Sequence, residues 1–389
     1  MTAVRVHNRV LLALVAVATA AVLLTGFVAL APNRLVSGKP VPLWQDVGWA
    51  MTGGIAVIGI VLLGSSLTRP RRQIHLLVTA AAAGLIVLLL AALGRAAATL
   101  AAGAPPLARI AADAGFWIPL GCAALAIVDA QQRLGSAAAM RLAIVAALAA
   151  ALVGLAAGGT FQALSLAREY QGHRAAFAAA VLRHILLVAG AVGPAVLIGA
   201  PLGIAALRRP RLRGPVFAVL NLLQTIPSIA LFGLLIVPLA ALAGAVPALG
   251  RAGVGGIGVA PALIALVLYA LLPVVRSTVA GLGGVDPAVL DAARGMGMSR
   301  RQRFWRVELP LAAPVLLAGF RVVTVQAIGL AVVAALIGAG GLGTFVFEGL
   351  GQYAVDLVLL GALPTIALAL AAEFGLQTAT AAVAGRFGR

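Results

Sequence analysis

The sequence predicts an all-α membrane protein with about ten transmembrane helices. Hydrophobic residues make up 63% of the 389 residues, against about 45–50% in soluble domains. Charged residues make up only 10%, against about 25% in soluble domains. Apolar runs of about 20 residues, the length that a helix needs to cross a bilayer, recur along the chain. This composition excludes a soluble enzyme and a nucleic-acid-binding domain, so we expect no nucleic acid partner.

The apolar runs give ten predicted spans. They cover residues 10–31, 47–67, 74–93, 116–128, 142–158, 179–207, 216–243, 259–281, 310–338 and 355–384. The fourth is the weakest, because its uninterrupted stretch is shorter than a crossing helix needs. The first has a small-residue pattern like a signal cleavage site at residues 29–31. It is nevertheless longer than a signal core of about 7–15 residues, and Pro32 follows the pattern, so we expect a retained span.

Basic residues gather in alternate loops, and this predicts the orientation of the chain. Of the 28 Lys and Arg residues, 19 lie at the two ends and in every second loop, and 7 lie in the opposite loops. Because cytoplasmic loops carry the excess of Lys and Arg, both termini and the loops at 69–72, 208–213 and 286–308 are expected in the cytoplasm. Residues 32–46 and 161–177 are expected outside. The net charge of +18 also predicts attraction to anionic membrane lipid.

The sequence offers little for catalysis or for binding a metal or nucleotide. Lys39 is the only lysine, so the chain has no Gly-Lys-Ser/Thr tripeptide of a phosphate-binding Walker loop. Cys122 is the only cysteine, which excludes an internal disulfide and a Cys-based metal site. Its place in an apolar run is typical of a small buried hydrophobe. We therefore expect no enzyme activity, no metal and no cofactor on this chain.

The two halves of the sequence differ in character. Residues 1–160 hold about five spans with short loops, and a helix outside the membrane is predicted at 161–177. Residues 171–389 hold about five spans with Pro, Gly and polar residues at membrane depth. Irregular backbone at that depth is tolerated only when it is buried in protein or lines a cavity. The sequence therefore predicts an N-terminal membrane extension at 1–170 and the working domain at 171–389.

A basic segment at 286–308, between the eighth and ninth spans, is predicted to form two short helices. Asp286 is a good N-cap for the first helix, and Gly297 can take the left-handed conformation that ends it. Ser299 then caps the second helix, and Pro310 opens the next span. The small side chains at 292 and 293 leave a face that a partner can approach closely. A basic loop that only fixes the topology is the alternative interpretation.

The spacing in this segment resembles the cytoplasmic signature of ABC importer permeases. That signature is Glu-Ala-Ala, three residues, Gly, nine residues, Ile, one residue and Leu-Pro. Here the matching residues are Asp291-Ala292-Ala293, Gly297, Val307 and Leu309-Pro310, with Asp for Glu and Val for Ile. In that family the segment is the coupling helix, which docks on a separate ATPase subunit. The resemblance assigns ATPase coupling to Asp291, Ala292, Ala293, Gly297, Arg300, Leu309 and Pro310.

Further motifs resemble the permeases for osmoprotectants, over residues 178–385. They lie at 224–228, 268–273, 294–298, 307–311 and 336–343. The resemblance implies import of a compatible solute such as glycine betaine, choline or a related quaternary amine, across the bacterial cytoplasmic (inner) membrane. It implies four kinds of partner: two copies of an ABC ATPase that binds ATP and Mg, a second permease copy or paralogue, an extracytoplasmic solute-binding protein, and membrane lipid. A permease for another small solute is the alternative.

A proline interrupts the seventh span. Pro227 removes a backbone hydrogen bond and is expected to free the carbonyl of Leu223. The polar residues beside it are Gln224, Thr225 and Ser228. We interpret this break as pathway lining or a gate, with Tyr269 as a lone aromatic candidate, while a kink needed only for packing is the alternative. The glycine-rich run at 338–343 is either a close-packing element or a passive turn.

Two charges are expected at similar depth in the last two spans. At 1.5 Å per residue, Arg321 lies about 16 Å into the ninth span and Glu373 about 20 Å from the inner end of the tenth. An unpaired charge there costs roughly 2.5–3.5 kcal/mol. We therefore expect Arg321 and Glu373 to pair, either as a structural ion pair or with Arg321 lining the pathway. An ion-coupled transporter is disfavoured, since Asp129, Asp356 and Glu373 are few and scattered.

Overall fold

The computed structural model describes residues 6–34, 36–251 and 253–387, which divide into two compact units, Met1–Gly172 and His173–Arg389. Nine helices in the described residues are long and apolar enough to cross a membrane. A tenth apolar helix, α1 (Arg9–Leu24), is shorter. The predicted all-α membrane fold with about ten spanning helices is confirmed. Arg5 and Arg389, which entered the charge count, lie outside the described residues.

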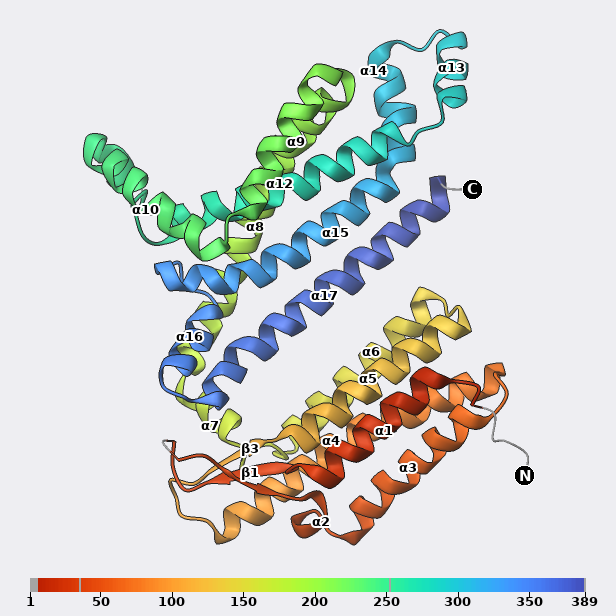
Figure 1. The fold of residues 1–389 in the computed structure, drawn as a ribbon, viewed down its shortest axis with the longest axis vertical. Helices are drawn as coiled ribbons and strands as arrows, with labels where there is room; N and C mark the ends of the chain where they lie inside the picture. Colours follow the sequence, from red (N-terminus) through yellow and green to blue (C-terminus); the bar gives the residue numbers. More distant parts are fainter. Residues whose placement is uncertain (1–5, 35, 252, 388–389) are drawn as a thin grey trace. The chain divides into compact units, whose positions relative to one another are not determined.

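The N-terminal unit is a helical bundle with a small sheet at one end (Figure 1). The bundle contains α1, α3 (Trp49–Leu67), α4 (Arg72–Gly103), α5 (Ala114–Leu134) and α6 (Ala138–Ala157). The antiparallel strands β1 (Val28–Ala31), β2 (Lys39–Val41) and β3 (Arg109–Ala112) form the sheet in the order β2-β1-β3. Two short helices, α2 (Leu43–Asp46) and α7 (Ser165–Gly172), complete the unit.

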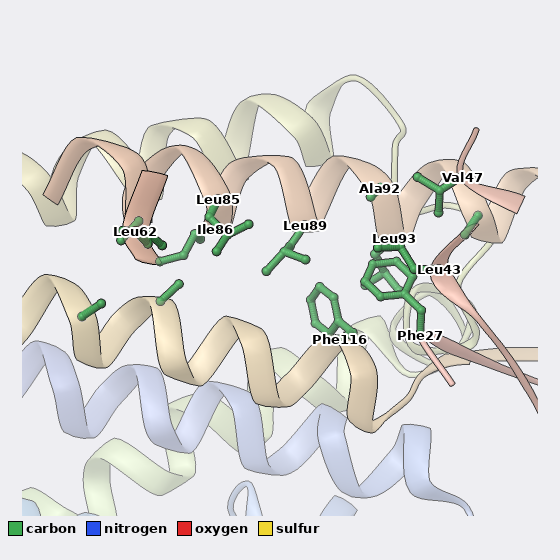
Figure 2. Packing of buried hydrophobic residues seen from close by; sticks show 14 of the residues in the cluster. Phe27, Leu43, Val47, Leu62, Leu85, Ile86, Leu89, Ala92, Leu93 and Phe116 are labelled. Carbon is green, nitrogen blue, oxygen red and sulfur yellow. The ribbon is translucent and has the colours of Figure 1, made fainter. Parts of the chain in front are cut away.

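The core of this unit lies between α4, α5 and the sheet. Leu85, Leu89 and Leu93 follow one another at every fourth position of α4, so they share one face of the helix, and all three are buried. Figure 2 shows them in a row facing the neighbouring helix, with Phe27 and Phe116 at the sheet end. These two rings pack edge to face with centroids 5.8 Å apart. The core therefore ties the sheet to the bundle.

The first apolar run is not a single helix, contrary to the sequence prediction. Helix α1 ends at Leu24, and residues 28–31 form the central strand β1. Tertiary pairing overrides the apolar pattern here, because β1 pairs on one side with β2 and on the other with β3. Gly26 permits this turn: a Cβ there would lie 2.6 Å from Pro40 Cβ and from Asp113 Oδ2. Helix α1 is thus about 24 Å long, below the ~30 Å hydrocarbon core.

A buried carboxylate joins α7 to the sheet, outside the candidate spans. Glu169 is 4% exposed and forms ion pairs with both Arg34 and Arg109. Burial alone raises the pKa of the Glu169 carboxyl, but hydrogen bonds and charge from Arg109 and Arg34 outweigh it and hold the pKa below its usual range. Ser165 Oγ accepts from the Ile110 amide at 2.7 Å and covers the β3 edge. The predicted external helix at 161–177 is thus α7, with its last residues already in α8.

The C-terminal unit is built on four long helices: α8 (Arg174–Arg208), α12 (Val259–Gly283), α15 (Leu309–Val333) and α17 (Val355–Phe387). Helix α12 packs against α8 and α15, and α15 packs against α17, beside which it lies in Figure 1. Small residues allow these close approaches. A Cβ at Gly199 would lie 2.8 Å from Val274 Cγ1, and one at Gly203 would lie 2.7 Å from Thr278 Cβ.

Shorter elements connect these four helices. They are α9 (Pro210–Thr225), α10 (Ser228–Ala245), α11 (Pro247–Arg251), α13 (Pro287–Gly295), α14 (Arg300–Arg303), the π turn η1 (Phe304–Glu308), the 3₁₀ turn η2 (Ala334–Ile337) and α16 (Gly343–Gly351). The glycine-rich run at 338–343 lies between η2 and α16. A Cβ at Gly343 would lie 1.9 Å from the Val332 carbonyl oxygen, and Gly341 has φ +88° beside the fully buried His184. These contacts support the close-packing interpretation of the run.

Candidate functional site

The segment at 286–308 begins with a capped helix, α13. The Asp286 carboxylate accepts from the Ala288 amide at 2.8 Å, and Pro287 occupies the first helical turn. Gly297 ends the helix with φ +74°, the left-handed conformation that the sequence suggested. A Cβ at this position would meet nothing within 4 Å, so the backbone angle alone favours glycine.

The second helix of the segment runs directly into the next span. Ser299 and Gln302 form a reciprocal capping box at the start of α14. The π turn η1 follows, in which the Leu309 amide donates to the Phe304 carbonyl, and then α15 begins. Pro310 has no N–H to donate, and the wider turn lies just before it. The helix is therefore continuous from Arg300 to Ile337, whereas the sequence analysis expected Pro310 to start a new one.

The two alanines of the segment point in different directions. Ala292 is exposed, while Ala293 is only 2% exposed, in a helix that packs against α14 and η1. The expected close-approach face therefore does not include Ala293, which is a correction to the sequence analysis. Val289 and Met296 are exposed and lie three residues before and four after Ala292, so these three residues share one face. We call Val289, Ala292 and Met296 the apolar ridge.

The remaining residues singled out in this segment lie beside the ridge. Asp291 Oδ1 pairs with Arg294 Nη1 at 2.5 Å, and both side chains are exposed. Such an exposed pair contributes little to stability. Arg300 is exposed at the start of α14, and Leu309 and Pro310 are half-buried at the start of α15.

Glu308 is a residue that the sequence analysis missed. Its Oε1 lies 2.9 Å from Arg303 Nε, and its Oε2 lies 4.0 Å from Arg208 Nη2, at the end of α8. The Arg208 guanidinium also lies over the Phe304 ring, 5.5 Å from the centroid. Apolar contacts among α8, α12, α13, η1 and α15 accompany this network. A lone carboxylate inside an arginine run was the sequence signal that could have identified it.

The predicted seventh span at 216–243 is two helices. Helix α9 ends at Thr225 and α10 begins at Ser228, with Pro227 in extended conformation between them. The Leu223 carbonyl is not free, contrary to the sequence analysis, because the Ile226 amide donates to it at 3.3 Å. The carbonyl of Ile226 itself precedes α10, and the Tyr269 hydroxyl donates to it. A side chain of α12 therefore supplies the donor for the Ile226 carbonyl at the break.

A second hydrogen bond runs in the opposite direction across the same contact. Pro273 lies four residues after Tyr269 in α12 and cannot donate to the Tyr269 carbonyl. Gln224 Nε2 donates to that carbonyl instead, at 2.7 Å. Gln224 of α9 thus supplies the donor that Pro273 cannot, and Tyr269 of α12 supplies a donor to the Ile226 carbonyl at the break. We call this reciprocal pair of hydrogen bonds, made by Gln224, Ile226, Tyr269 and Pro273, the clasp.

The clasp changes how the proposed pathway residues are placed. Tyr269 is 5% exposed, and its hydroxyl is used in the clasp, as is the Gln224 amide. Thr225 Oγ1 donates to the Leu222 carbonyl at 2.7 Å. Pro227 is exposed, and Ser228 is half-buried at the start of α10. Gln224 and Tyr269 therefore stabilise the break between the two helices, whereas Thr225 and Pro227 are exposed.

The charges in the last two spans lie in contact. Arg321 Nη1 is 3.1 Å from Glu373 Oε1, and the side chains are 27% and 40% exposed. Arg321 Nε is buried and has no hydrogen-bond partner. A cavity of about 750 Å³ between α8, α15 and α17 is lined mainly by apolar side chains. Within the described residues, no three His, Cys, Asp or Glu side chains gather as a metal site would require.

Two family models match the chain. The one described as "ABC transporter permease YehY, N-terminal domain" matches residues 7–167. The one described as "Binding-protein-dependent transport system inner membrane component" matches residues 195–379. The second match includes α13, η1 and all four residues of the clasp.

Curated relatives match the C-terminal half. The osmoprotectant import permease protein OsmW of Salmonella typhimurium strain LT2 is 43% identical over 200 residues, which is 51% of this chain and 88% of that protein. The carnitine transport permease protein OpuCB of Listeria monocytogenes is 41% identical over 50% of this chain and 82% of its own length. The choline transport system permease protein OpuBB of Bacillus subtilis is 37% identical over 50% of this chain and 83% of its own length.

The clasp predicts a specific loss of stability. In Tyr269→Phe the Ile226 carbonyl loses its donor inside the protein, so the free energy of unfolding should fall by about 1–3 kcal/mol. Thermal unfolding of the purified protein in detergent measures this change. Tyr353→Phe removes the same atom from a side chain that is 90% exposed and serves as the matched control. Equal unfolding temperatures for the two variants would show that the clasp contributes nothing.

Proposed function

The chain belongs to the binding-protein-dependent ABC transport permeases of the inner membrane, and we propose that it moves a compatible solute: glycine betaine, choline or a related quaternary amine. The observation that carries this proposal is the 43% identity over 88% of the osmoprotectant permease OsmW. Relatives named for carnitine and choline transport point to the same chemical class. We further propose residues 171–389 as the transporting domain and residues 1–170 as a membrane extension.

In this proposal the chain makes and breaks no covalent bond. ATP and Mg bind to a separate ATPase, present in two copies, and a second permease copy or paralogue completes the pathway. An extracytoplasmic solute-binding protein delivers the solute. The apolar ridge suits the ATPase contact, because it is exposed and sits on a helix that is fixed at both ends by Asp286 and Gly297. Ala293 supports the ridge from behind by packing within the segment.

Movement of the segment would reach the spans by two connections. Helix α15 continues from α14 without a break, so a displacement of α14 passes directly into the ninth span. Glu308 connects the same segment to Arg208 at the end of α8. Helix α12 packs between α8 and α15, contacts α10, and is joined by the clasp to α9 and to Ile226 after it. The clasp thus lies within the set of helices that the ATPase would move.

We propose a cytoplasmic position for both termini and for the segment at 286–308. The excess of arginine in alternate loops supports this orientation. The exposed arginines Arg208, Arg209, Arg211 and Arg213 lie at the end of α8 and the start of α9, on the proposed cytoplasmic side, where anionic lipid headgroups would attract them.

Uptake measurements test the function itself. Cells that lack compatible-solute uptake should accumulate radiolabelled glycine betaine or choline when they express this chain together with its ATPase and solute-binding protein. A Walker-loop lysine substitution in the ATPase should abolish the uptake, because ATP hydrolysis drives it. Uptake of neither solute, with all subunits present in the membrane fraction, would exclude the proposed solute class.

A pair of neighbouring alanines tests the coupling contact. Ala292→Glu places a charge on the exposed ridge, so the permease should reach the membrane in normal amount but lose the ATPase on purification. Ala293→Glu places the same charge in a buried position, so the amount of permease itself should fall. Co-purification of the ATPase and the permease yield are the two measurements. Normal ATPase binding by Ala292→Glu would exclude the ridge as the contact.

Single cysteines test the orientation. On a Cys122→Ala background, Arg211→Cys and Ser37→Cys each place one thiol at an exposed position. A membrane-impermeant thiol reagent should label position 37 in intact cells and position 211 only after the cells are opened. The reverse pattern would invert the proposed orientation.

A further inference from the structure

The Arg321–Glu373 pair lies near the middle of α15 and α17. Arg321 is twelve residues from either end of α15, or about 18 Å at 1.5 Å per residue. Glu373 is 18 residues from the start of α17 and 14 from its end, or about 27 Å and 21 Å. A hydrocarbon core about 30 Å thick that is centred on these two helices encloses both charges. The long helices therefore place both charges where water reaches only through protein.

This pair is more open than two other carboxylate sites of the chain. Glu169 and Glu308 each have two arginine partners and are 4% and 15% exposed. Glu373 has one arginine contact within 4.0 Å and is 40% exposed. A charge that faces lipid at the centre of a membrane helix costs roughly 2.5–3.5 kcal/mol, even on the insertion-experiment scales that give the lowest values. The exposed side of the pair is therefore expected to face a polar space.

The pair also has unused hydrogen-bonding capacity. A guanidinium has five N–H donors, and one contact to Glu373 is made here, through Nη1 at 3.1 Å. Arg321 Nε is buried without a partner. The Arg321 side chain is 27% exposed, so an incoming carboxylate can form a charge-assisted hydrogen bond with the accessible N–H groups of the guanidinium. Arginine suits a carboxylate because its planar fork can bind both oxygens.

We propose that Arg321 and Glu373 form a transient site for zwitterionic solutes in the pathway, and this inference rests on the proposed function. The carboxylate of the solute pairs with Arg321 while its quaternary ammonium lies beside Glu373. The solute replaces one ion pair by two, and the site stays neutral before, during and after passage. Choline carries no carboxylate and meets only Glu373. The pair thus favours carboxylated amines such as glycine betaine and carnitine over choline.

A substitution at position 321 tests this inference. The complete importer is expressed with wild-type permease or with Arg321→Gln, and initial uptake rates are measured at saturating radiolabelled glycine betaine and at saturating choline. Both permeases share one solute-binding protein, so a changed ratio of the two rates belongs to the permease. Arg321→Gln should lower the betaine-to-choline ratio by about tenfold, the loss of one charge-assisted contact. Arg133→Gln removes an arginine from an ion pair in the N-terminal unit and is the matched control.

The possible results separate the two proposals. If the wild-type importer takes up neither solute, the proposed function fails. If Arg321→Gln slows both solutes equally, the pair is only structural and the inference fails. If Arg321→Gln lowers the amount of permease, the exchange Arg321→Glu with Glu373→Arg decides. A permease restored in amount but with a lowered betaine-to-choline ratio supports the site, and one with the wild-type ratio overturns it.

Discussion

Backbone carbonyls inside the hydrocarbon have no water to accept from, and the C-terminal unit is organised around this constraint. Prolines lie inside α8, α10, α12, α15 and α17 and between α9 and α10, and each removes a backbone donor. The Ile226 amide donates to the Leu223 carbonyl that Pro227 leaves, and in the clasp Gln224 donates to the Tyr269 carbonyl while Tyr269 donates to the Ile226 carbonyl. The carbonyls of Leu223 and Ile226 at the break between α9 and α10 therefore both have donors. A broken helix in this position gives the protein an irregular element that a moving pathway can use.

Buried charges, like buried carbonyls, need partners. The carboxylates of this chain differ in how many arginine partners they have. Glu169, outside the candidate spans, is held by two arginines and keeps its pKa below the usual range. Glu308 also has two arginines and joins the coupling segment to α8. Glu373 has one arginine contact and remains more exposed. The two well-satisfied carboxylates hold elements together, whereas the less satisfied pair is suited to exchange partners.

The sequence predicted the features that depend on local residue type and spacing. Apolar run length gave the spans, Gly297 took the backbone angle that ends α13, and counting residues placed Arg321 and Glu373 at the depth where they meet. Features set by distant segments were not predictable. The strand β1 looks like helix because Val28–Ala31 are apolar in either state, and its partner β3 is about 80 residues away. Ala292 and Ala293 are indistinguishable in sequence, and only packing against α14 and η1 decides which is buried.

The helix from Arg300 to Ile337 is uninterrupted, so a movement at one end is transmitted to the other. Its 38 residues give a rod about 57 Å long at 1.5 Å per residue. Tilting such a rod by about 5° about one end moves the other by about 5 Å, with no hydrogen bond broken along the way. A small rotation at the arginine-rich end therefore arrives at the glycine-rich run beyond Ile337 as a displacement of nearly one helical turn. Because that run is tightly packed, its residues must rearrange to accommodate such a displacement.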